Sequence, residues 1–278
     1  MNKLKLAGIG LLIILGIILL ASFFSASSAP APTQAEWDAI RAADFPVFSG
    51  EWGTPVRLVV SDAGWEDSLF VTSDGARVYF AYYFGDLIGD FASRKFSDDL
   101  DMYYSDAPFA SKTKDTRFHL SEDIWSEVGP MLTSTGDYFY NSNRDYLNDQ
   151  KADTDVWLNN ERLAFNDAVA DSEYGNPHYN ESTDTLWLDE LDQRMWVLKN
   201  AKANNFSGTP EPAPFPIQVD GYANFQPWLS ADGKTLLFST NRGEIAGING
   251  PQIYMSTRNE DNTWNTPTLI AYSKIGLG

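Results

Sequence analysis

Short segments in which apolar and polar residues alternate run through most of the chain, and turns of the Asp-Gly type separate them. Alternation with a period of two is typical of strands that bury one face. In residues 227–243, PWLSADGKTLLFSTNRG, two apolar stretches flank a Ser-Ala-Asp-Gly turn. This arrangement predicts a β-hairpin, because the Asp-Gly pair favours the tight turn that reverses a strand.

The same hairpin pattern occurs four times along the chain. Aligned on the turn, the copies place in one column Gly75, Gly136, Thr183 and Gly233. Third strands are expected at 101–105, 155–159, 194–198 and 252–256, and fourth strands at 116–120, 161–165, 215–219 and 264–270. Four-stranded repeats with a spacing of roughly 50 residues are the signature of propeller blades. The sequence therefore predicts an all-β propeller with blades at about 65–120, 127–166, 174–219 and 224–272.

Two short motifs recur inside the repeat. Ser142-Asn143-Arg144 corresponds to Thr240-Asn241-Arg242 after the second strand, and Asp101-Met102-Tyr103 corresponds to Asp155-Val156-Trp157 in the third strand. With these motifs the repeat resembles the WD40-like, TolB-type β-propeller repeat of exported proteins. The resemblance covers about residues 52–278 and is weakest in the third copy. It implies a fold, and it implies no particular activity because such folds carry many functions.

Residues that recur in several copies are interpreted as structural. They are Asp74, Gly75, Asp101, Gly136, Asn143, Arg144, Asp155, Asp232, Gly233, Asn241 and Arg242. The Asp-Gly residues are expected to form the turns, since glycine accepts a positive φ without strain. The recurring Arg and Asp residues are expected to pair within a blade, for example Arg144 with Asp155.

The two ends of the repeat region do not together supply the four strands of one closing blade. Residues 51–60, EWGTPVRLVV, resemble the fourth-strand segment at 263–272, TWNTPTLIAY. We therefore expect 51–60 to be the outer strand of the blade that closes the ring. The whole would be a five-bladed propeller that is truncated before its last blade, so that four blades are visible. The alternative is a closed four-bladed ring in which 51–60 lies against 264–270 as an added outer strand. We favour the first interpretation, because an unclosed ring leaves sheet edges that need to be covered.

Residues 1–35 are expected to lie outside the propeller domain of residues 36–278. The segment MNKLK carries two lysines, the apolar run 6–24 follows it, and the small, Pro-rich stretch SASSAPAPTQ comes next. This order is typical of an export signal, and the apolar run is also long enough for an N-terminal membrane anchor. Both alternatives predict an exported protein that is periplasmic, at the cell surface or secreted.

Charge and composition exclude several classes of function. The net charge is −18, so nucleic acid is not expected as a partner and a membrane is expected only at the N-terminal segment. The chain has no Cys, which excludes disulfides and cysteine catalysis, and its two His residues leave little room for a metal site. His119 and His178 are expected to be packed in the core. No cofactor is expected, although Asp98, Asp99 and Asp101 form a possible Ca²⁺ site without the Gly and Glu of an EF-hand loop.

Candidate site residues come from the starts of the first strands, which line the channel of a propeller. Glu66, Asp67 and Glu127 are the candidate catalytic acids. The candidate ligand-binding residues are Trp65, Ser68, Trp125, Asn176 and Gln226. Carboxylates beside aromatic rings suit a sugar or a cation, whereas acids in so acidic a chain are also common as solvated loop residues.

Two functions are consistent with these candidates. The first is a non-catalytic module that binds a protein or a glycan, and the alternative is a carbohydrate-active hydrolase that uses the acids at the channel mouth. Hydrolysis of a glycosidic bond needs two carboxyl groups about 5–10 Å apart. The hydrolase therefore requires carboxylates from two blades that face each other across the mouth. The chain holds no Gly-x-Ser-x-Gly motif that would indicate a serine hydrolase.

Overall fold

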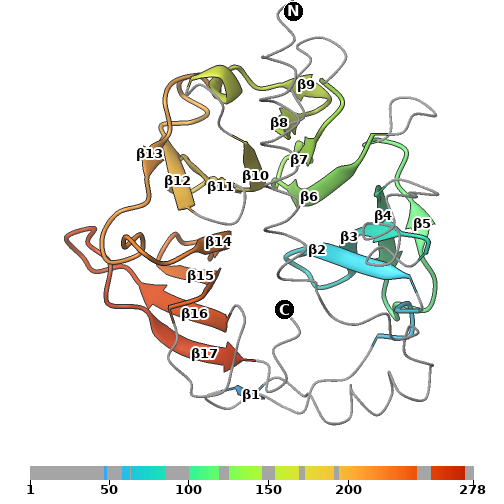
Figure 1. Cartoon of the computed structure of the whole chain (residues 1–278). Coiled ribbons are helices and arrows are strands. Elements are labelled where there is room, and N and C mark those ends of the chain that lie inside the picture. Colours follow the sequence, from blue (N-terminus) through green and yellow to red (C-terminus); the bar gives the residue numbers. More distant parts are fainter. Residues whose placement is uncertain are drawn as a thin grey trace, which may run out of the picture.

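Four antiparallel sheets make up the computed structural model of this chain (Figure 1). The structure describes residues 47–48, 58–62, 64–85, 100–118, 125–145, 154–168, 173–190, 194–242 and 252–272. The strands of blade one are β2 (Trp65–Val71), β3 (Arg77–Tyr83), β4 (Asp101–Asp106) and β5 (Thr113–Lys114). Those of blade two are β6 (Glu127–Leu132), β7 (Tyr138–Ser142), β8 (Asp155–Leu158) and β9 (Glu161–Arg162).

Blades three and four repeat this plan. The strands of blade three are β10 (Tyr174–Asn180), β11 (Thr185–Glu190), β12 (Arg194–Lys199) and β13 (Glu211–Pro212). Those of blade four are β14 (Asn224–Leu229), β15 (Thr235–Thr240), β16 (Gln252–Thr257) and β17 (Thr268–Tyr272), with β1 (Val47–Phe48) beside β17. A short 3₁₀ helix, η1 (Ala164–Asp167), follows β9.

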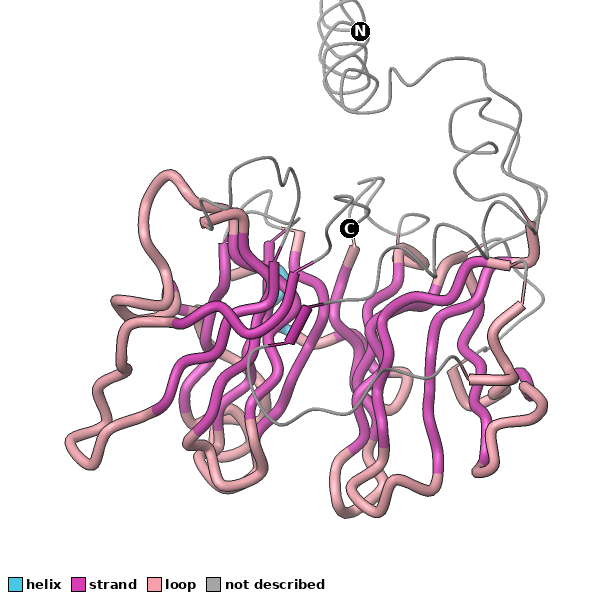
Figure 2. The backbone as a smooth tube through the Cα atoms, turned by 90° about the horizontal axis from the view of Figure 1, so that it is seen from below, coloured by secondary structure: helices cyan, strands magenta, loops and turns pink. Residues whose placement is uncertain are grey.

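The blades stand around a central axis with their first strands innermost (Figure 1). Strand β2 packs against β6, β6 against β10, and β10 against β14. Seen from below, the strands run alongside one another from one face of the molecule to the other (Figure 2). The prediction of an all-β propeller built from four-stranded blades is confirmed.

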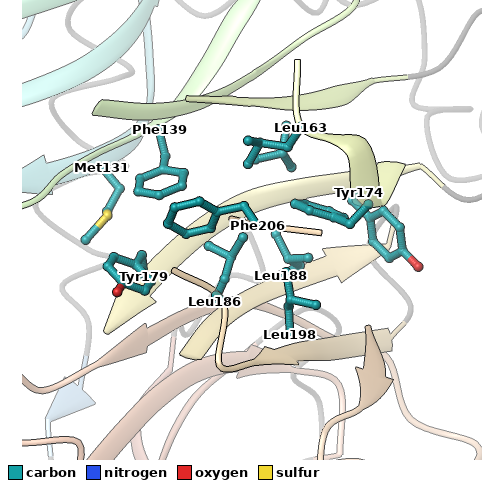
Figure 3. Close-up of a cluster of buried hydrophobic side chains, with 12 residues drawn as sticks. Met131, Phe139, Leu163, Tyr174, Tyr179, Leu186, Leu188, Leu198 and Phe206 are labelled. Atoms are coloured by element: carbon teal, nitrogen blue, oxygen red, sulfur yellow. The ribbon is translucent and has the colours of Figure 1, made fainter. Parts of the chain in front are cut away.

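The core lies between the blades, as successive layers of large side chains. Blades two and three meet through a cluster that includes Phe139, Leu186 and Phe206 (Figure 3). Trp187 of blade three packs edge-on against Trp264 of blade four. Equivalent aromatic packing joins blades one and two. Aromatic side chains suit these layers because each buries a large area and tolerates edge-to-face contact.

The hairpin turns follow the predicted chemistry. Gly233 has a φ of +69°, and the carboxylate of Asp232 accepts hydrogen bonds from the Ser230 hydroxyl (2.6 Å) and the Lys234 amide (3.0 Å). These two donors lower the pKa of Asp232. In the third copy, which lacks glycine at this position, the positive φ falls on Asp184 instead. The turn is thus retained where the motif is lost, because Asp also tolerates the left-handed region.

The outer strands differ from the sequence expectation in blades one and three. The fourth strands β5 and β13 precede the expected segments 116–120 and 215–219. Phe118 and Ile217 in those segments are fully buried. Their apolar character therefore reflects packing against the core and not strand pairing.

The predicted outer strand at 51–60 is wrong in its last part. Leu58 to Ser61 forms a turn closed by the Ser61 amide and the Leu58 carbonyl (3.2 Å), and residues 51–57 lie outside the described residues. The added strand is β1, in which Val47 pairs with Tyr272. It covers the edge of β17 that would otherwise be open. This resembles the added strand of the four-bladed alternative, except that it comes from further upstream.

The ring does not close through its first strands as the other interfaces do. In the described part of the chain, β14 and β2 do not pack closely against each other. The fifth blade stays a prediction. No helix among the described residues is long and apolar enough to cross a membrane, and residues 1–35 lie outside them.

Candidate functional site

A cavity of about 330 Å³ lies among the four first strands. We call it the central cavity. Its walls are formed by residues 66–70 of β2, 129–131 of β6, 176–178 of β10 and 226–228 of β14. Each blade thus contributes the same part of its first strand, which makes the cavity a property of the repeat.

A β-bulge shapes each of these wall segments. The pairing with the second strand shifts register at the same point in every first strand. The bulged residues have positive φ and are Ser68 (+53°), Gly129 (+67°), Asn176 (+45°) and Gln226 (+53°). A bulge bends its strand and redirects the side chains beside it. The bulges therefore determine which side chains line the central cavity.

Polar side chains of the second strands hold two of the bulges from the neighbouring blade. The side-chain carbonyl oxygen of Asn141 accepts a hydrogen bond from the backbone amide of Asn176 (3.3 Å). The Asp189 carboxylate accepts the Gln226 amide (2.7 Å) and the Asn176 side-chain Nδ2 (2.9 Å). In blade one the corresponding position is Ala81, which has no polar group to offer. Sequence reasoning missed these residues, although each is a polar side chain in a strand whose other residues are mostly buried and apolar.

Gly129 has no room for a side chain. A Cβ built on it would lie 2.5 Å from the Asn141 carbonyl oxygen. The glycine therefore allows the Asn141 side chain to reach across to blade three. This close approach explains why blade two has glycine where the other blades have Ser, Asn or Gln.

Two of the three candidate acids line the central cavity. Glu66 accepts a hydrogen bond from the Ser61 hydroxyl (3.3 Å) and lies 3.4 Å from the Lys112 ammonium. Asp67 follows it on the same strand, and its Oδ1 accepts the Ser68 amide (2.6 Å). Both acids therefore come from blade one.

The structure places Glu127 elsewhere. Its side chain is fully buried, and Oε1 accepts hydrogen bonds from Arg144 Nη2 (2.5 Å) and the Ser142 hydroxyl (3.1 Å). Arg144 also donates to the Phe118 carbonyl of blade one (2.8 Å). Glu127 and Arg144 thus join blades one and two, and Glu127 is not among the described residues that line the cavity.

The expected pairing of Arg144 with Asp155 is wrong. Asp155 pairs with Arg162 of β9 (2.8 Å), and Asp101 pairs in the same way with Lys114 of β5 (2.6 Å). The Asp at the start of each of these third strands is therefore bound by the fourth strand. Arg144 instead turns toward the first strand of its own blade.

The second Asn-Arg motif repeats the same arrangement. Arg242 donates to the Asn224 side-chain oxygen (2.8 Å) and to the Pro216 carbonyl of the preceding segment (3.1 Å). The Asn residues hold the chain just before the first strand, because Asn143 accepts the Ser126 amide (3.0 Å) and Asn241 accepts the Ala223 amide (2.9 Å). The motif therefore anchors the connection from one blade to the next.

The candidate ligand-binding residues divide into two groups. Ser68, Asn176 and Gln226 line the central cavity, whereas Trp65 and Trp125 are not among its described lining residues. Phe70 and Trp228 both lie in the wall, and Trp228 is the more exposed of the two, at 45%. Sequence reasoning missed Trp228, because only the bulge at Gln226 brings this part of β14 to the cavity.

His178 also belongs to the wall, as a buried neutral imidazole. Its Nε2 lies 2.9 Å from the Leu229 carbonyl of blade four, so that nitrogen carries the proton and Nδ1 keeps its lone pair. Burial lowers the pKa of His178 from 6.5 to about 4. The ring is therefore neutral at physiological pH.

We predict that His178 makes the protein less stable in mild acid. In the unfolded chain this imidazole is protonated below about pH 6.5, whereas in the folded protein it stays neutral down to about pH 4. The free energy of unfolding therefore falls as the pH drops from about 6.5 to about 4. The loss attributable to His178 approaches about 3 kcal/mol. Urea unfolding of wild type and of His178→Met at pH 7 and pH 4 measures it, since Met131 occupies the same position in blade two. An equal pH dependence of the two proteins would contradict this assignment.

The possible Ca²⁺ site lies largely outside the described residues, because Asp98 and Asp99 do. Asp101, the described member, is bound to Lys114. No group of three or more His, Asp or Glu side chains suited to a metal ion occurs in the part of the chain that the structure describes.

Comparison with known proteins gives only distant likenesses. No protein-family model matches the chain, and no curated protein matches it significantly. A puromycin-hydrolysing peptidase from Mycobacterium tuberculosis is 12% identical with a TM-score of 0.40, and the match covers 76% of this chain and 32% of the peptidase. An oligogalacturonate lyase in complex with manganese is 10% identical with a TM-score of 0.36, covering 76% of this chain and 55% of the lyase.

An oligogalacturonate lyase from Vibrio parahaemolyticus gives similar values. It is 12% identical with a TM-score of 0.37, and the match covers 77% of this chain and 68% of the lyase. The chain spans about a third of the peptidase and about half of the manganese-bound lyase. At these values the likenesses carry no conclusion about activity or ligand.

Proposed function

We propose that this protein is an exported, non-catalytic β-propeller that binds a glycan in its central cavity. A volume of about 330 Å³ suits a small ligand or one end of a longer chain. A protein ligand is the other member of the binding class. The combination of an indole ring with amide and hydroxyl groups in the wall favours the glycan.

The observation that carries this proposal is the composition of the cavity wall. The half-exposed ring of Trp228 lies in the same wall as the polar side chains of Ser68, Asn176 and Gln226. An aromatic face packs against the C–H groups of a sugar, while amide and hydroxyl groups exchange hydrogen bonds with its hydroxyls. Ligand sites of this kind combine apolar area with a few well-placed polar groups.

The arrangement of acids favours binding over hydrolysis. The described carboxylates in the wall, Glu66 and Asp67, are consecutive on β2 and both belong to blade one. Glu127 is bound to Arg144 instead. A pair of carboxylates from different blades across the cavity, which the hydrolase needs, does not occur among the described lining residues.

Export is proposed from the sequence alone. The lysines, the apolar run 6–24 and the Pro-rich stretch that follows support a signal peptide or a retained anchor. Contact with a membrane is proposed only through that segment. The net charge of −18 supports the absence of nucleic-acid partners.

We predict that Trp228→Ala lowers glycan binding about fivefold or more, because stacked aromatic contacts contribute on the order of 1 kcal/mol or more. The measurement is binding of the labelled protein to a carbohydrate array, followed by titration calorimetry with the best oligosaccharide. Ile253→Ala is the matched control, since Ile253 is similarly exposed but lies on β16 outside the cavity wall.

Three outcomes would count against this proposal. Loss of binding in Ile253→Ala as well would indicate a general defect and not a cavity site. Wild-type binding by Trp228→Ala would move the site elsewhere. Hydrolysis of an oligosaccharide by the wild-type protein would support the alternative function, a carbohydrate-active hydrolase.

A further inference from the structure

We propose that the glycan bound in the central cavity is an amino sugar, whose protonated amine is neutralised by Asp67. This inference rests on the proposed function and specifies the chemical class of its ligand. It comes from the charge and hydrogen-bonding capacity that the cavity wall leaves unused.

Asp67 is the acid in the wall whose charge is not compensated. Its Oδ1 accepts the Ser68 amide, and no Lys or Arg of the described residues lies within ion-pair distance of its carboxylate. The neighbouring Glu66 differs, because it shares the Lys112 ammonium (3.4 Å) with Asp62 (2.8 Å). A negative charge in a partly enclosed site favours a cationic ligand.

The neutral side chains of the wall leave both acceptors and donors for a ligand. His178 Nε2 donates to the Leu229 carbonyl, which leaves Nδ1 as an acceptor. Asn176 Nδ2 donates one of its two hydrogens to Asp189, so its side-chain carbonyl oxygen remains an acceptor and its second N–H remains a donor. Gln226 contributes donors, since its Oε1 accepts from the Ser239 hydroxyl (3.1 Å) and its side-chain nitrogen remains able to donate.

A ligand that fits this wall must donate hydrogen bonds to the Asp67 carboxylate and to the acceptors of His178 and Asn176. An ammonium group donates three hydrogen bonds and accepts none, while each hydroxyl of a sugar both donates and accepts. The exposed face of Trp228 adds a surface that attracts cations as well as sugar C–H groups. An amino sugar combines these properties, and a neutral sugar leaves Asp67 without a partner.

The test is titration calorimetry with glucosamine, glucose and N-acetylglucosamine at pH 6. Glucosamine is expected to bind about tenfold more tightly than glucose, since a charge-assisted hydrogen bond exceeds a neutral one by about that factor. N-acetylglucosamine has no charge on its nitrogen and is expected to bind no more tightly than glucose. The comparison with N-acetylglucosamine removes the positive charge of the ligand without changing the protein.

Asp67→Asn is expected to reduce the preference for glucosamine over glucose to about one. Asp220→Asn is the matched control and is expected to keep the full preference, because the Asp220 side chain is almost completely exposed and lies outside the cavity wall. Should Asp67→Asn fail to fold, the comparison of glucosamine with N-acetylglucosamine still decides.

Equal affinity for the three sugars would overturn the inference and leave the proposed function in place. Absence of binding by all three would also overturn it, while the oligosaccharide array tests the proposed function separately. An unchanged preference in Asp67→Asn would assign the charge recognition to another group.

Discussion

Replacement of Arg144 by alanine is expected to lower the free energy of unfolding by about 3–5 kcal/mol. The guanidinium binds Glu127, the Ser142 hydroxyl and the Phe118 carbonyl, and both partners of the ion pair are nearly inaccessible to solvent. Its removal leaves a buried carboxylate without its cation, which is far more costly than the loss of a surface pair. It also cuts the polar link between blades one and two. Urea unfolding of the variant measures the loss.

Arg194→Ala is the matched control for this prediction. Arg194 lies 3.9 Å from Asp220, and both side chains are exposed, at 54% and 99%. Such a pair contributes at most about 1 kcal/mol. A double-mutant cycle with Glu127→Gln then isolates the coupling between Arg144 and Glu127. Equal small losses for Arg144→Ala and Arg194→Ala would contradict the role of Arg144 as an inter-blade link.

Replacement of Asp189 by alanine is expected to cost about 2–4 kcal/mol and to weaken ligand binding in the central cavity. The buried carboxylate accepts the Gln226 amide and the Asn176 side chain, and both donors lose their partner in the variant. The bulge at Gln226 then loses the contact to its backbone amide, while the backbone amide of Asn176 keeps its bond to Asn141. Unfolding by urea and calorimetry with the best-binding oligosaccharide measure the two effects.

Asp189→Asn is the conservative variant for comparison. Asn141 shows that a neutral amide at this position can hold a bulge of the next blade. We therefore expect Asp189→Asn to retain most of the stability that Asp189→Ala loses. Similar behaviour of the two variants would indicate that the hydrogen bonds to the bulges contribute little.

The repeat could be predicted from the sequence because its signals are local. The glycines of the turns, such as Gly75 and Gly233, follow from the need for a positive φ between two adjacent strands. Alternating apolar residues mark the strands on either side. Both signals depend on a few neighbouring residues, so four copies in succession predicted the propeller.

The cavity wall could be predicted only in part, because its geometry depends on contacts between blades. The column of first strands indicated Asp67, Ser68 and Asn176, which do line the cavity. The bulges are not apparent from the sequence, since Ser, Asn and Gln at those positions are ordinary strand residues. Trp228 was missed for that reason.

Glu127 was assigned to the channel for a related reason. It occupies the same position before the bulge as Glu66, and the sequence could not distinguish them. The difference arises from Arg144, which stands next to Glu127 in the folded blade and is replaced in blade one by Phe84. The presence or absence of an arginine after the second strand therefore decides whether this glutamate is bound within the blade or lines the cavity.

A crystal structure of the protein with its best-binding carbohydrate tests the central claim most directly. The account predicts a sugar ring in the central cavity, in contact with the Trp228 ring and hydrogen-bonded to Asn176 or Gln226, whose side chains line it. A sugar bound on the outer strands with the central cavity unoccupied would contradict the account.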